Sequence, residues 1–163
     1  IMKIALKIKP DFICIVPENR KEVTTEGGLD VKSNKKKLKD IINKFKKDKI
    51  RTSLFINPSI SDVKVSKFLE ADCVEIHTGR LAQLVKSKKN YKKELFKIKK
   101  CSSLANKIGL EVHAGHGLDY KTTKILSKIK EIKEFNIGHY IIGESIIYGL
   151  KKVIKNFKKI IKK

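Results

Sequence analysis

The sequence has 163 residues, with 39 Lys and Arg against 17 Asp and Glu, and a formal net charge of +22. Its 40% hydrophobic content is enough for a globular core, and its length suggests one domain, 1–163. No run approaches the roughly 18 apolar residues of a membrane span. Arg, the side chain that nucleic-acid readers favour, occurs only at Arg20, Arg51 and Arg80. We therefore interpret the lysines as solvated helix faces and expect no nucleic-acid or membrane partner.

Cysteine usage and the first residues bear on the compartment. Cys14, Cys73 and Cys101 are an odd number with no metal-like spacing, which is typical of core thiols in a reducing environment. The start, "IMKIALKIKP", has no signal-peptide pattern. We expect a cytoplasmic protein without a metal site.

Short apolar runs alternate with longer lysine-rich helical patterns along the chain. The predicted strands are 11–17, 51–57, 72–78, 110–115 and 135–138. The predicted helices are 34–48, 59–70, 90–108, 120–131 and 140–162, with 79–89 predicted as a loop containing one helical turn. Ser59 and Asp119 are suited to cap the helices that follow them. The last helix carries an apolar stripe at spacings of three and four: Ile142, Ile146, Leu150, Val153, Phe157 and Ile160.

Strands separated by helices predict parallel βα units, either in an open doubly wound sheet or in part of a (β/α)₈ barrel. All four histidines lie at or near the C-terminal ends of predicted strands, the edge where a barrel builds its active site from several strands. No glycine-rich GxGxxG turn follows the first strand. We favour the barrel. At roughly 30 residues per unit the chain has room for about five of its eight units.

Three motifs carry candidate chemistry. In "DCVEIHTG", strand alternation places Glu75 and His77 on the barrel interior and Val74 and Ile76 against the helices. A buried carboxylate there suits acid–base work, or forms a structural pair with Lys or His. In "HAGHGLD", His116 lies between two glycines that allow a sharp turn and a close ligand approach, unless this is an ordinary turn.

The third motif is "NIGHYIIGES", where a strand ends at Gly138–His139 and a helix begins at once. Free N–H groups at a helix start suit a phosphate, although a plain strand-to-helix turn would look the same. A loop after the first strand, "PENRKEVTTEGGLD", adds hydroxyls and an Arg that could hold a phosphorylated or polyhydroxy substrate.

Five segments in this order resemble the pyridoxine 5′-phosphate synthase family: "CIVPENRKEVTTEGGLDV", "SLFI", "VEIHTG", "AGHGL" and "NIGHYIIG". The resemblance covers essentially the whole chain. It implies a TIM barrel that assembles as a homo-octamer and needs no metal or organic cofactor. It also implies condensation of 1-deoxy-D-xylulose 5-phosphate with 3-amino-2-oxopropyl phosphate, giving pyridoxine 5′-phosphate, inorganic phosphate and water.

The resemblance also implies residue roles. His116 matches the family's proton donor, and Glu75 matches a carboxylate that stabilises the transition state. Thr24 matches a contact to deoxyxylulose phosphate. The groups that hold the amino-oxopropyl phosphate match Gly117, Gly138 and His139. No role is assigned to His77 or His113.

One departure from the family pattern is large. The family's first three strands, with their catalytic His and Glu bases, have no counterpart here, and "IMKIALKIKP" resembles the helix after the third strand. We expect the last five βα units of a barrel, inactive alone, from a fragment of a longer protein or a decayed gene. The alternatives are a non-catalytic remnant and, less favoured, a basic polyanion-binding protein that uses "GLKKVIKNFKKIIKK".

Overall fold

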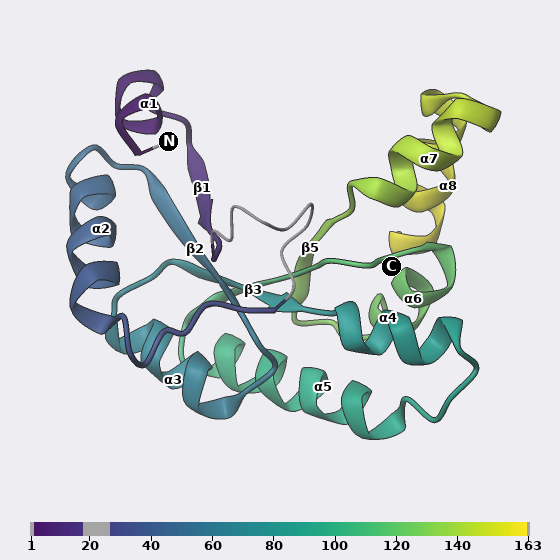
Figure 1. The fold of residues 1–163 in the computed structure, drawn as a ribbon, viewed down its shortest axis with the longest axis horizontal. Coiled ribbons are helices and arrows are strands. Elements are labelled where there is room, and N and C mark those ends of the chain that lie inside the picture. Colours follow the sequence, from purple (N-terminus) through teal and green to yellow (C-terminus); the bar gives the residue numbers. More distant parts are fainter. Residues whose placement is uncertain (1, 18–26, 163) are drawn as a thin grey trace.

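The computed structural model describes residues 2–17 and 27–162, which form an α/β fold of five parallel strands alternating with helices (Figure 1). The strands are β1 (Phe12–Ile15), β2 (Arg51–Ile56), β3 (Cys73–His77), β4 (Glu111–Gly115) and β5 (Ile132–Asn136). They lie in chain order, each parallel to the next. A doubly wound sheet would reverse its strand order at a switch point. The described strands contain no such reversal, so the order favours the barrel-type arrangement.

Eight helices are described: α1 (Met2–Ile8), α2 (Lys35–Lys47), α3 (Ile60–Phe68), α4 (Gly79–Lys86), α5 (Lys92–Lys107), α6 (Tyr120–Leu126), α7 (His139–Tyr148) and α8 (Leu150–Ile161). Both predicted caps are confirmed. The Ser59 side chain accepts a hydrogen bond from the backbone N–H of Asp62, and Asp119 accepts one from the N–H of Thr122 at 2.7 Å. Each cap satisfies an N–H group that the first helical turn leaves without a partner.

The segment 79–89 is more helical than the predicted loop with one helical turn, because α4 is a helix of 8 residues. Its apolar side chains Leu81 and Val85 are buried in the core. The flanking glycine and lysines hid this short amphipathic pattern. The predicted helix 120–131 is also shorter than expected, since α6 ends at Leu126.

The predicted single helix 140–162 is wrong as well. Gly149, at φ 77°, ends α7 and starts α8, so the apolar stripe is broken between them. On the α8 side Val153 and Phe157 are buried, and the Phe157 ring packs against Tyr120 of α6. On the α7 side Ile146 remains 83% exposed. Only the second half of the stripe therefore packs against the rest of the fold.

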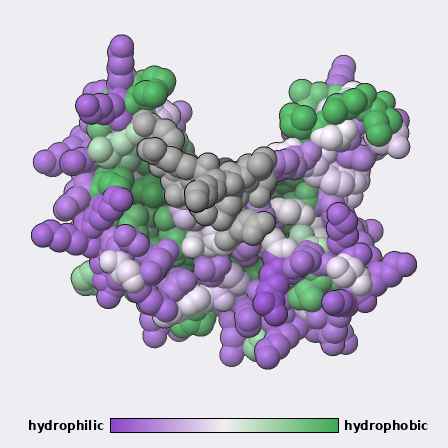
Figure 2. Space-filling model, viewed as in Figure 1, coloured by the Kyte–Doolittle hydropathy of each residue, from purple (hydrophilic) through white to green (hydrophobic). Residues whose placement is uncertain are grey.

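The core lies between the sheet and the helices α2 to α6, which cover one face of it (Figure 1). Val74 and Ile76 on β3 are fully buried there, together with Ile98 of α5. The opposite face of the sheet is concave, and Figure 2 shows the molecule hollowed on this side. No helix in the described ranges is long and apolar enough to cross a membrane.

A single contact shows how strongly the sheet curls. Cys14 on β1 and Asn136 on β5 both hydrogen-bond to the same oxygen of Glu75, on the central strand β3. In a flat sheet their backbones would lie roughly 10 Å to either side of β3. Because both reach one carboxylate, the two edge strands must bend toward each other over the concave face.

Candidate functional site

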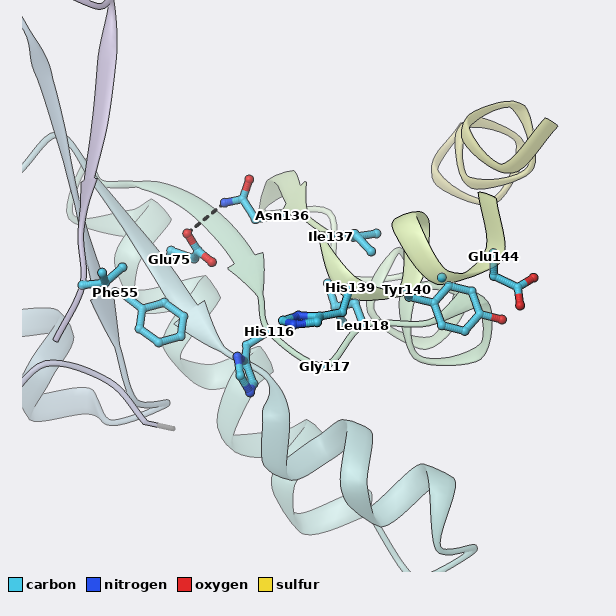
Figure 3. A pocket seen from close by; sticks show the side chains of 13 residues that line it. Phe55, Glu75, His116, Gly117, Leu118, Asn136, Ile137, His139, Tyr140 and Glu144 are labelled. Carbon is cyan, nitrogen blue, oxygen red and sulfur yellow. Dashed lines mark hydrogen bonds between the residues drawn. The ribbon is translucent and has the colours of Figure 1, made fainter. Parts of the chain in front are cut away.

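A cavity of about 950 Å³ opens at the carboxyl ends of the strands, on the concave side of the sheet (Figure 3). It is lined by five of the six residues predicted to form the site: Glu75, His116, Gly117, Gly138 and His139. They come from three separate strand ends, so the fold brings together motifs that lie up to 64 residues apart in the sequence. The sixth, Thr24, lies outside the described residues.

Glu75 occupies the floor of the cavity. Its side chain points away from Val74 and Ile76, which confirms the alternation predicted for β3. Its Oε2 accepts a hydrogen bond from Asn136 Nδ2 at 2.9 Å and one from Cys14 Sγ at 3.4 Å. Burial raises the pKa of Glu75 above its usual value, while the two hydrogen bonds oppose that rise. The site therefore contains a carboxylate that is both desolvated and held in place.

His116 follows β4 at the rim, with φ at 79°, and Gly117 follows with φ at 72°. Two successive residues in the left-handed region make a sharp turn that a bulky residue at 117 would not adopt readily. A Cβ on Gly117 would also lie 3.1 Å from Cβ of Ala82. The predicted tight turn at "HAGHG" is thus confirmed, and it places His116 in the wall of the cavity.

The ring of His77 packs beside that of His116, with the centroids 4.8 Å apart. On its other side His77 meets the edge of Phe55 at 5.3 Å. Burial, followed by the neighbouring His116, lowers the pKa of His77 to about 4. His77 is therefore a neutral ring near pH 7. Gly79 makes this stack possible, because a Cβ there would lie 2.7 Å from Cδ2 of His116.

The N-terminus of α7 forms another wall of the cavity. Gly138 is the N-cap residue, and His139 and Tyr140 begin the helix. The first N–H groups of a helix have no partner within it and attract anions. Nothing lies within 4 Å of where a Cβ of Gly138 would stand, so the approach to these groups is open among the described residues.

Sequence reasoning missed Asn136, Phe55, Tyr140 and Glu144, which also line the cavity. The signal for Asn136 was its period-two spacing from Glu134, but the predicted strand 135–138 began three residues after β5 does. Phe55 was available by the same alternation, because it pairs with Glu75 across β2 and β3. Tyr140 and Glu144 depend on where α7 lies, which no local pattern reveals.

His113 does not belong to this cavity, although it was placed with the other histidines near a strand end. It lies in the middle of β4 and is 1% exposed. Its Nε2 is 2.8 Å from Oε1 of Glu111, and its Nδ1 is 3.5 Å from Oε1 of Glu134. The ring is thus held toward the amino ends of the strands, away from the rim.

Cys73, Glu111 and His113 are the one group among the described residues whose donor atoms lie close enough for a metal ion, within 4.8 Å of one another. The guanidinium of Arg51 already lies against it, with Nη2 3.0 Å from Oε2 of Glu111 and 3.2 Å from Sγ of Cys73. Since a cation occupies the negative side of the group, the arrangement is an ion-pair network and a poor metal site.

Comparison with known proteins decides the family. The family model described as "Pyridoxal phosphate biosynthesis protein PdxJ" matches residues 1–163. The chain belongs to the PdxJ family. Its relatives in the family include the pyridoxine 5′-phosphate synthase of Pelagibacter ubique, which is 66% identical over 163 residues, all of this chain and 68% of the relative. The synthase of Prochlorococcus marinus strain MIT 9211 is 45% identical over 160 residues, covering 98% of this chain and 65% of the relative.

A third PdxJ relative, the synthase of Hydrogenobaculum sp., is 44% identical over 158 residues, covering 94% of this chain and 65% of that protein. The chain therefore spans about two thirds of the length of the curated relatives it matches. This share agrees with the five βα units counted along the sequence. The family match confirms the resemblance on which the residue roles rest.

Proposed function

We propose that this chain carries part of the active site of a pyridoxine 5′-phosphate synthase. The reaction condenses 1-deoxy-D-xylulose 5-phosphate with 3-amino-2-oxopropyl phosphate and releases pyridoxine 5′-phosphate, phosphate and water. The observation that supports it is the convergence of Glu75, His116, Gly117, Gly138 and His139 on one cavity. A shared cavity is what a two-substrate condensation needs, because the reacting groups must meet within one site.

In this proposal each wall of the cavity has its own task. Glu75, buried but braced in its charged form, stabilises positive charge that develops during ring formation. His116, at the rim, donates a proton to a leaving oxygen. The N-terminus of α7, with Gly138 and His139, receives the phosphate of the amino-oxopropyl substrate together with Gly117. Thr24 contacts deoxyxylulose phosphate.

The remaining parts of the proposal follow from the family. The five strands are part of a closed TIM barrel, because β1 and β5 leave open edges and the sheet already curls toward closure. The working enzyme is a cytoplasmic homo-octamer, and no metal or organic cofactor takes part. The exposed apolar side chains of α7, Ile142, Ile146 and Ile147, suit a buried contact surface.

The test is complementation of a strain that requires pyridoxine. We expect no growth when residues 1–163 are expressed alone, because the retained site holds a donor, a carboxylate and a phosphate site but lacks the family's bases from the second and third strands. Loss of a base removes a contribution of roughly 10²–10⁴-fold. We expect growth when the same segment is fused to a three-unit N-terminal piece of an active relative.

Both arms of this experiment can contradict the proposal. Growth with the 163-residue chain alone would show that the missing strands are not needed. Failure of the fusion to support growth, while a fusion built on the matching segment of the Pelagibacter ubique protein succeeds, would favour the non-catalytic remnant. Protein levels measured by immunoblot in each strain separate poor expression from lost activity.

A further inference from the structure

The carboxylate of Glu75 is held by one oxygen only. Asn136 Nδ2 donates to Oε2 at 2.9 Å, and the Cys14 thiol donates to the same Oε2 at 3.4 Å. Oε1 accepts no hydrogen bond from any described residue. The two donors come from β5 and β1, on opposite sides of β3, so they grip Oε2 from two directions.

Gly115, on the neighbouring strand β4, leaves room for Oε1 of Glu75. A Cβ at position 115 would stand 1.9 Å from Oε1 of Glu75, so only glycine leaves room for the carboxylate in this orientation. The terminal torsion of a Glu side chain is otherwise broad and allows the two oxygens to exchange places. The two hydrogen bonds to Oε2 favour one rotational state of the carboxylate, and Gly115 leaves the room that this state needs.

We propose that Cys14 and Asn136 are positioning residues that clamp Oε2 of Glu75 and leave Oε1 for the substrate. The inference rests on the proposed function, in which Glu75 stabilises the transition state. A carboxylate fixed in advance loses no rotational freedom when charge develops beside it, which is the advantage of a preorganised site. Cys14 and Asn136 act through Glu75 and need not touch the substrate themselves.

The chemistry of the two donors suits this task. Asn136 cannot ionise, so it remains a donor at every pH. Cys14 as a residue is exposed at the edge of the sheet, but its thiol points at Glu75. Desolvation of the thiol, followed by the charge of Glu75, raises the pKa of Cys14, so it keeps its proton where Glu75 has lost its own. Both hydrogen bonds favour the charged carboxylate and offset part of the burial that opposes it.

The experiment is a titration of the Glu75 side-chain carboxyl carbon by NMR, on the 163-residue chain labelled with ¹³C-glutamate. The resonance is assigned by its disappearance in Glu75→Gln. The variants are Asn136→Ala, Cys14→Ala and Cys14→Ser. Matched controls remove the same side-chain types elsewhere: Asn106→Ala on the exposed side of α5, and Cys101→Ala, whose thiol lies in the helix layer. Circular dichroism verifies that each variant is folded.

We expect Asn136→Ala and Cys14→Ala each to raise the pKa of Glu75, by roughly one unit for the stronger Asn136 bond, because each removes a donor to the charged form. Cys14→Ser should leave the pKa of Glu75 at or below its wild-type value, since a hydroxyl is a better donor than a thiol. The controls should leave it unchanged. Should Asn136→Ala leave the pKa of Glu75 at its wild-type value, or should Cys14→Ser behave like Cys14→Ala, the clamp is overturned.

A second measurement, made with a further variant in the active fusion, tests the consequence for turnover. It does not depend on the folding of the variants above. In the active fusion, Asn136→Asp keeps the size of the side chain but places a second carboxylate against Oε2. We expect kcat to fall at least tenfold with KM nearly unchanged, and the acidic limb of the kcat profile to move to higher pH. An unmoved pH profile would contradict the proposal. The NMR titration needs no turnover, so its result stands even if the chain proves to be a non-catalytic remnant.

Discussion

The concave face of the sheet carries two polar layers built on the same strands. They differ in whether their side chains pair with one another or face the cavity. The lower layer consists of Arg51, Cys73, Glu111, His113 and Glu134, whose side chains contact one another at 2.8 to 3.5 Å. The upper layer, Glu75, Asn136 and the rim residues His116, Gly138 and His139, lines the cavity. The charged side chains of the lower layer pair with one another, whereas the polar groups of the upper layer face the cavity.

The difference shows which polar groups on this face serve the fold. In barrels the residues at the amino ends of the strands serve stability, and those at the carboxyl ends serve catalysis. Here the step from His113 to His116, three residues along the chain, crosses from one layer to the other. Residue type alone therefore does not distinguish a structural His from a candidate proton donor. The layer in which it lies does.

The largest expected effect separates the layers by activity. In the active fusion, His116→Asn should reduce kcat by about 10²–10⁴-fold with little change in KM, since a proton donor matters chiefly in the transition state. His113→Asn, in the lower layer, is the matched control and should retain most of kcat. Steady-state kinetics on both variants check this. Near-normal kcat with a raised KM for His116→Asn would make His116 a binding residue.

A smaller effect tests the phosphate wall of the upper layer. Gly138→Val adds bulk in front of the α7 N-terminus, at a position where a Cβ meets nothing within 4 Å, so the fold should accept it. We expect KM for the amino-oxopropyl phosphate to rise by roughly tenfold, near the most that a helix N-terminus contributes to anion binding. KM for deoxyxylulose phosphate should change less. Equal rises for both substrates would indicate a general folding defect instead.

The smallest effect should appear in the lower layer, as stability without activity. Hydrogen bonds from His113 and then Arg51 hold the pKa of Glu111 below its ordinary 4.5. Glu111→Gln should lower the free energy of unfolding by about 1 kcal/mol, mostly through the weakened bond to buried His113, because the partly exposed pair with Arg51 is screened. Urea unfolding at pH 7 measures this.

The pH dependence of this loss has a definite sign. A carboxylate whose pKa is depressed by folding stabilises the protein above its unfolded pKa, and that stabilisation disappears as the pH falls through the folded pKa. The difference between wild type and Glu111→Gln should therefore be complete at pH 7 and shrink below about pH 4. Glu131→Gln, a carboxylate without an ion pair among the described residues, should show no such difference.

The sequence by itself determined the local features of this protein. Period-two alternation correctly divided Val74 and Ile76 from Glu75, and the caps at Ser59 and Asp119 followed from residue type and position. The five strands and the site motifs could be read because each depends on residues that are adjacent in the chain. The same reading failed at Gly149, where one left-handed residue breaks a pattern that seemed continuous.

Only the tertiary structure decided which of these local features meet. Cys14 and Asn136 are 122 positions apart and belong to opposite edges of the sheet, yet both reach Oε2 of Glu75. The metal-like group around His113 became an ion-pair network because Arg51 arrives from another strand. Periodicity reports which face a side chain occupies, whereas the curvature of the sheet, on which helices α2 to α6 pack, determines what that face encloses.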